Sequence, residues 1–199
     1  MSSLLDMVMQ QVQGGGIQQM SRSLGLGEDD VTKVVSGALP ALMGSLTRNS
    51  GSGDGASALL GALDRDHDGS ILDDVAGFLG QSGSADAGAG ILKHALGGKQ
   101  STVETALSRS TGVDSASAGK ILAMLAPIVM GALGKAKRQQ GLDASGLAGL
   151  LGQEEQVARQ RSPQAVDMLS RVLDSDGDGD VMDDVAKLGT SLLGSLFKN

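Results

Sequence analysis

Apolar residues recur along most of the chain at intervals of three and four, which is the spacing of one face of a helix. The first such segment contains Leu4, Leu5, Val8, Met9 and Val12. Glycines at 14–16 are expected to end this helix, and a second short helix is predicted for 17–24. A third helix is predicted to run from Glu28 to about Leu46. Pro40 lies inside that helix and predicts a kink or a break there.

The clearest motif is an Asp-x-Asp-x-Asp-Gly loop that occurs twice, at 64–74 and again at 174–184, 110 positions later. Carboxylates at alternate positions can surround one hard cation, and the glycine permits the sharp turn that follows the third ligand. Helices over 56–63 and 73–79 are expected to enter and leave the first loop. The sequence therefore predicts two calcium sites, each lying between two helices.

We expect each Ca²⁺ ion to be held by carboxylates and by one backbone carbonyl. The predicted ligands are Asp64, Asp66, Asp68, the carbonyl of Ser70 and Asp74 in the first loop, and Asp174, Asp176, Asp178, the carbonyl of Asp180 and Asp184 in the second. Asp73 and Asp183 are the alternative closing ligands, or else they cap the following helices. Both loops lack the glutamate that closes a complete EF-hand loop, so we expect dissociation constants on the order of 10⁻⁵ to 10⁻³ M and a structural role. The competing interpretation is that these carboxylates only solvate a turn and cap helices.

The two halves of the chain repeat one another. At a shift of 87 positions, Ser21–Gly25 corresponds to Ser108–Gly112, and Pro40 corresponds to Pro127. The expected fold is an all-α, duplicated helical bundle in which each repeat ends in an EF-hand-like calcium loop. The first repeat is predicted to span 1–80, a linker of Gly, Ser and Ala 81–90, and the second repeat 91–199. Within this organisation, 48–55 is expected to be a flexible connection and 152–161 a polar insertion, as a solvated helix or loop. Ile71 and Val181 follow the two loop glycines, and we expect them to pair as short strands.

One segment resembles a known family. The Gly-x-Leu-Pro-x-Leu-Met-Gly sequence at 37–44, its partial echo at 130–133 and the Asp-rich loop leading into Leu-Asp-Asp-Val are similar to the bacterial YidB-like family of uncharacterised proteins. The resemblance covers most of the chain, which looks like a two-copy member. It implies an all-helical fold and a bacterial source, but it implies no activity.

The composition limits which side chains can form the core and which kinds of site the chain can contain. Only 1% of the residues are aromatic, whereas 31 are Gly and nine are Met, so closely approaching helices with small side chains are expected. The chain has no Cys, which excludes disulfides and thiolate sites. Its net charge is −7, and 11 of its 23 acidic residues lie in the two loops. Two divalent ions would reduce the net charge to −3.

Other candidate sites are weaker. His67 is interpreted as an exposed spacer within the first loop, and His94 as a surface residue. The basic residues at 135–138 suit the C-terminus of a helix, and an acidic protein without stacking aromatics is not expected to bind nucleic acid. The apolar run at 121–134 is too short to span a membrane, and the N-terminus lacks the pattern of a secretion signal. A cytoplasmic location is therefore expected.

These observations favour a non-enzymatic, calcium-stabilised interaction or scaffold protein. Its expected partner is another copy of itself in a homo-oligomer, or a different protein. The alternative is a carrier of an apolar small ligand held between the two repeats. Six methionines are candidates to line such a cavity: Met7, Met9, Met20, Met43, Met124 and Met130.

Overall fold

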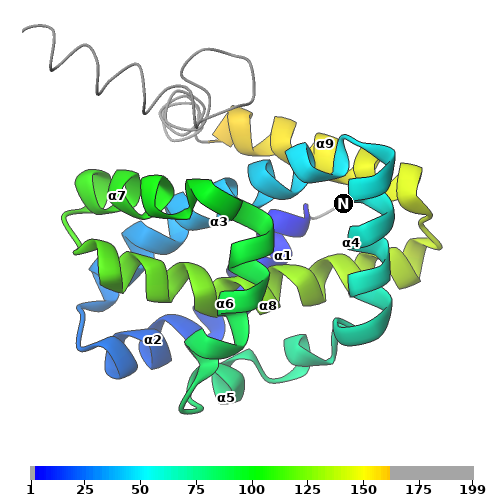
Figure 1. Ribbon diagram of the computed structural model, residues 1–199. Coiled ribbons are helices and arrows are strands. Elements are labelled where there is room, and N and C mark those ends of the chain that lie inside the picture. The colour runs from blue at the N-terminus through cyan, green and yellow to red at the C-terminus, as the bar shows by residue number, and fades with distance from the viewer. Residues whose placement is uncertain (1–2, 162–199) are drawn as a thin grey trace, which may run out of the picture.

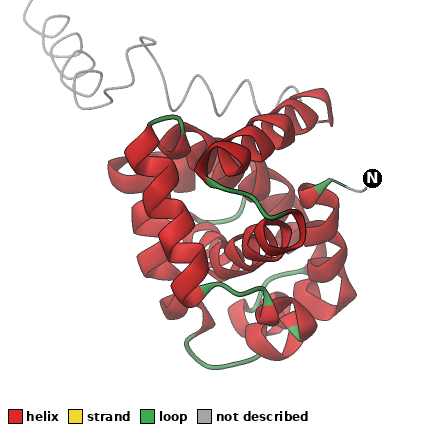
Figure 2. Cartoon of the chain, turned by 90° about the vertical axis from the view of Figure 1, so that its right-hand side faces the viewer, coloured by secondary structure: helices red, strands yellow, loops and turns green. Residues whose placement is uncertain are grey.

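The computed structural model describes residues 3–161, and these residues form a bundle of helices (Figure 1). The helices are α1 (Leu4–Gln11), α2 (Ile17–Leu24), α3 (Glu28–Ser50), α4 (Gly53–Asp66), α5 (Val75–Leu79), α6 (Ser84–Leu96), α7 (Gln100–Thr111), α8 (Ser115–Gln140) and α9 (Ala144–Arg161). A π-type turn at Val12–Gly16 joins α1 to α2, and 3₁₀ turns lie at Ser70–Asp73 and Gly97–Lys99. Seen from the side, this part of the chain consists of helices joined by short loops (Figure 2). The all-α prediction is confirmed.

The bundle is built around α3 and α8. In Figure 1, α8 runs across the middle of the molecule. Every residue is buried over 38–46 of α3 and over 121–134 of α8. Both segments contain an internal proline, Pro40 and Pro127, and the helix continues past each of them. The break that we expected at Pro40 does not occur, because packing on all sides outweighs the one hydrogen bond that proline removes.

The expected linker at 81–90 is wrong over most of its length. Helix α6 begins at Ser84 and packs along α8, so 84–90 form its first turns. The small residues of this segment allow α6 to pack closely against α8. A Cβ atom added to Gly88 would lie 1.7 Å from the carbonyl oxygen of Ala123 in α8, so the two helices touch at this point. The flexible connection expected at 48–55 is also wrong, because α3 continues to Ser50 and α4 begins at Gly53.

The two halves share one hydrophobic core. A single cluster of buried side chains includes Leu39 and Leu42 from α3, and Leu122 and Leu125 from α8. Several helix boundaries follow the shift of 87 positions found in the sequence. Helices α2 and α7 both end on a glycine in the left-handed conformation, Gly25 and Gly112, and α3 and α8 begin at positions 28 and 115.

In the described part of the chain, α8 is the one helix that is long and apolar enough to cross a membrane by length and composition alone. However, 78% of its most apolar window is buried inside the protein. A central core helix has the same character, so this observation is weak evidence for a membrane span.

Candidate functional site: a cavity beside the Asp-rich loop

The first Asp-rich segment starts inside a helix. Helix α4 continues through Asp66, so Asp64 and Asp66 lie in its last turn and not in a loop. The chain then turns at Gly69, whose φ of +86° is a left-handed conformation that favours glycine. A 3₁₀ turn follows, and α5 begins at Val75.

This segment rests against the C-terminal half of α8. The carbonyl oxygen of His67 lies 1.8 Å from the position that a Cβ atom on Gly134 would take, and Cγ2 of Ile71 lies 2.4 Å from that on Gly131. Two glycines one turn apart therefore let the segment contact the α8 backbone directly. Ile71 belongs to the 3₁₀ turn, so the strand that we expected there does not form. Its expected partner, Val181, lies outside the described residues.

The predicted calcium ligands of the first loop have separate partners. The Asp64 carboxylate forms an ion pair with Lys137 of α8, and Nη1 of Arg138 lies 4.0 Å from Oδ2 of Asp68. The backbone N–H of Ser70 donates to Oδ1 of Asp68 at 2.9 Å. This interaction and the Ser70 side chain lower the pKa of Asp68. The basic residues at 135–138 thus do more than complement the helix dipole.

Asp74 caps α5, because the N–H of Gly77 donates to its Oδ1 atom at 2.7 Å. We had suggested that cap for Asp73, and Asp74 forms it instead. Among the described residues, no three acidic or histidine side chains are grouped closely enough to hold a metal ion. The second predicted site at 174–184 lies outside the described residues.

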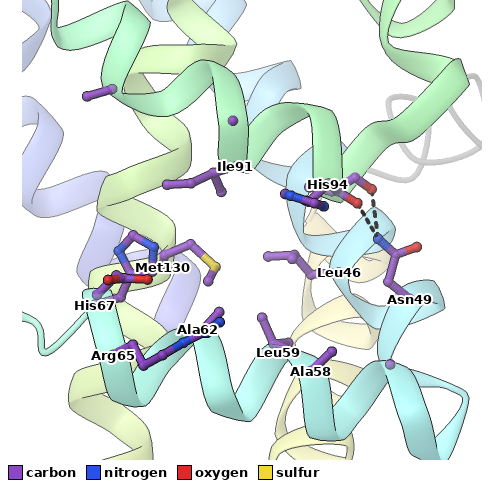
Figure 3. Close-up of a pocket in the computed structure, with 15 residues that line it drawn as sticks. Leu46, Asn49, Ala58, Leu59, Ala62, Arg65, His67, Ile91, His94 and Met130 are labelled. Atoms are coloured by element: carbon purple, nitrogen blue, oxygen red, sulfur yellow. Dashed lines mark hydrogen bonds between the residues drawn. The ribbon is translucent and has the colours of Figure 1, made fainter.

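A cavity of about 740 Å³ lies between α3, α4, α6 and α8, with the end of α4 at one side (Figure 3). Its lining residues are Leu46, Asn49, Gly55, Ala58, Leu59, Ala62, Arg65, Asp66, His67, Ala87, Gly90, Ile91, His94, Ala95 and Met130. Most of these side chains are aliphatic. The cavity therefore offers an apolar interior that has polar groups at its edges.

One of the polar groups holds two walls of the cavity together. The amide nitrogen of Asn49 in α3 donates to the carbonyls of His94 and Ala95, at 3.2 and 2.9 Å (Figure 3). These bonds use both amide hydrogens and satisfy carbonyls at the C-terminal end of α6. Nε of Arg65 donates to the carbonyl oxygen of Gly61 within α4, at 3.2 Å.

His67 is half-buried and lines the cavity, so its interpretation as an exposed spacer is wrong. Burial lowers the pKa of His67, and the neighbouring Asp66 offsets part of that shift. A smaller pocket of about 180 Å³ is also lined by His67 and Ile91, so the two pockets share these residues.

The six methionines that were candidates to line a ligand cavity lie in different surroundings. Among the six candidates, Met130 lines the cavity. Met20, Met43 and Met124 are buried members of the core. Helical spacing alone does not distinguish a core methionine from one that lines a cavity, because both face inward.

Sequence reasoning missed Glu154. This residue lies in the supposed polar insertion, which is the second half of α9, yet it is only 6% exposed. Its two carboxylate oxygens accept hydrogen bonds from the backbone N–H groups of Leu4 and Leu5, at 2.8 and 3.1 Å. A carboxylate at this position satisfies two free donors of α1 and complements its dipole. No local pattern indicates a partner that lies 150 residues away.

The comparisons with known proteins add a family but no activity. No curated protein and no solved structure matches the chain. A family model described as bacterial protein of unknown function (DUF937) matches residues 6–136, which is well over half of the chain. The matched region includes α3, α4, α6 and most of α8, and with them all the residues that line the cavity. The chain therefore belongs to this bacterial family of unknown function, DUF937.

Proposed function

We propose that this protein is a non-enzymatic binding protein that holds a small apolar ligand in the cavity between α3, α4, α6 and α8. The observation that carries the proposal is the cavity itself. Its volume of about 740 Å³ falls within the range of small-molecule sites, and its lining is mainly aliphatic, as in such sites. Binding is favoured over catalysis because Asn49 and Arg65 donate hydrogen bonds to backbone carbonyls of the walls themselves.

Titration with Nile red, an uncharged apolar dye, tests this proposal. The protein has no Trp or Tyr, so the dye signal is free of their background. We expect saturable binding, and we expect Ala62→Phe to abolish it by filling the cavity from α4. Ser57→Phe is the matched control, because Ser57 is exposed on the same helix and lies outside the cavity lining. Equal dye binding by the two variants would refute the proposal.

A second candidate function is that of a calcium-binding interaction or scaffold protein. Three observations support it. The carboxylates of Asp64, Asp66 and Asp68 are exposed. The segment that carries them is anchored against α8. The same acidic spacing recurs at 174–178. In this proposal, Ca²⁺ replaces the Lys137 and Arg138 cations as the counter-charge of the segment. The ion would be structural, and the protein would assemble with itself or with another protein in the cytoplasm.

Isothermal titration of chelator-treated protein tests the calcium proposal. We expect two sites with dissociation constants on the order of 10⁻⁵ to 10⁻³ M, and the loss of one site in Asp66→Asn. Asp54→Asn, at the other end of α4, is the matched control. An absence of heat up to millimolar calcium would reject the sites. Light scattering with and without chelator tests assembly, and a monomer in both conditions would reject the scaffold.

We also propose that the two halves are copies of one helical unit. The matched boundaries of α3 and α8 and their equivalent prolines support this origin. In this view the cavity, which α3 and α4 form together with α6 and α8, arises where the two copies meet.

A further inference from the structure

We propose that the ligand of the cavity is an uncharged molecule with an unbranched alkyl chain, and that its polar end is hydrogen-bonded by the imidazole of His67. This inference rests on the proposed function, because it names the class of ligand that the same cavity takes. It follows from three properties of the lining: the shape of its side chains, its charge and its one half-buried polar ring.

The side chains of the lining suit an alkyl chain. Leu46, Leu59, Ile91 and Met130 surround the centre of the cavity (Figure 3). Apart from the two histidines, no described lining residue carries a ring. A planar aromatic ligand would therefore lack the flat surfaces on which such ligands stack. A flexible chain can follow an irregular aliphatic wall, and the adaptable thioether of Met130 helps the wall to fit it.

The charges of the lining favour an uncharged ligand. Arg65 and Asp66 carry opposite charges, and they are adjacent in the last turn of α4, at the same end of the cavity. Their fields largely offset one another, so that neither a carboxylate nor an ammonium group gains a net attraction there. Removing an ion from water is costly unless it is paired. A charged end group would bear that cost without compensation.

The half-buried polar ring is His67. Its backbone is held against Gly134 of α8, which fixes the origin of the side chain. The ring lines the cavity and is half-buried there, and a neutral imidazole offers one N–H donor and one acceptor nitrogen. The other candidates are less suitable. His94 is exposed on α6, and the amide hydrogens of Asn49 are already used.

Displacement of Nile red by three ligands of equal chain length tests the inference. At pH 8, 1-decanol is uncharged, decanoate is an anion and decylammonium is a cation. We expect 1-decanol to bind at least about tenfold more tightly than either ion, a difference of roughly 1.4 kcal/mol. If either ion binds as tightly as the alcohol, the inference is wrong while the proposed function stands. If neither Nile red nor any of the three ligands binds, the proposed function itself fails.

Replacement of the imidazole tests the role of His67. His67→Leu keeps an apolar side chain in place but removes the hydrogen bond, so we expect the affinity for 1-decanol to fall about two- to tenfold. His67→Gln should restore part of the loss, because its amide can still donate and accept. Saturable Nile red binding by both variants, whatever its affinity, shows that the cavity is intact. Unchanged affinity of His67→Leu for 1-decanol would overturn the assignment.

Discussion

Substitution of Gly88 by alanine should push α6 and α8 apart at the point where they touch. Gly88 lies on the face of α6 that contacts α8, and the added Cβ atom would lie 1.7 Å from the Ala123 carbonyl oxygen and 3.0 Å from Cδ of Pro127. Ordinary contacts begin near 3.4 Å. The obstacle is backbone and a proline ring, so it cannot move aside as the end of a flexible side chain could.

The magnitude follows from two opposing effects. Forcing an extra carbon into a packed core costs typically 1–3 kcal/mol, and a backbone obstacle places this site near about 3. Alanine also stabilises a helix by about 1 kcal/mol relative to glycine. The free energy of unfolding of Gly88→Ala should therefore fall by about 2 kcal/mol.

Urea unfolding followed by far-UV circular dichroism measures this change, since the chain has no tryptophan to report by fluorescence. Gly90→Ala is the matched control. Gly90 lies in the same helix, is exposed, and has no atom within 4 Å of the added carbon. That variant should be more stable than the parent by up to about 1 kcal/mol. If the Gly88→Ala variant is as stable as the Gly90→Ala variant, the described packing of α6 on α8 is refuted.

Two further predictions concern buried or half-buried ionisable groups. Glu154→Ala leaves two N–H groups at the start of α1 without their acceptor and should reduce the free energy of unfolding by about 1–3 kcal/mol. Glu155→Ala on the same helix breaks only a pair with Arg159 and should cost about 0.3–0.5 kcal/mol; equal losses would contradict the cap. The pKa of His67 is lower in the folded protein than its ordinary 6.5, so the unfolded chain takes up the proton first. The contribution of His67 to the free energy of unfolding is fully present above about pH 7, and it declines as the pH falls through 6.5 towards the pKa of the folded state. His67→Gln should therefore weaken the dependence of the urea midpoint on pH between about pH 7 and 5. If the midpoint of the variant changes with pH as steeply as that of the parent protein, the dependence arises from other groups.

Short-range features of the fold could be predicted from the sequence. The start of α3 at Glu28 follows from the acidic residues of its first turn, and the left-handed end of α2 at Gly25 follows from the glycine. The stretch at 81–90 shows the limit of such reasoning. Its Gly and Ala residues have the composition of a linker, but in the fold their small size lets α6 touch α8 at Gly88.

The candidate site depends on contacts that no local pattern encodes. Asp64 and Lys137 are 73 residues apart in sequence, and their ion pair exists only because α4 crosses α8. The cavity depends in the same way on four helices that leave a space between them. Alternate carboxylates indicate a candidate cation loop, whereas the direction of each carboxylate is decided by its tertiary neighbours.

The bond between Glu154 and the start of α1 has a consequence for the boundaries of the family. The family match ends at residue 136, before the helix that carries this carboxylate. A protein that ended at residue 136 would lack the Glu154 acceptor of the Leu4 and Leu5 N–H groups and would expose the sides of α3 and α4 that α9 covers. The described bundle therefore depends on contacts made by a helix that lies beyond the matched residues.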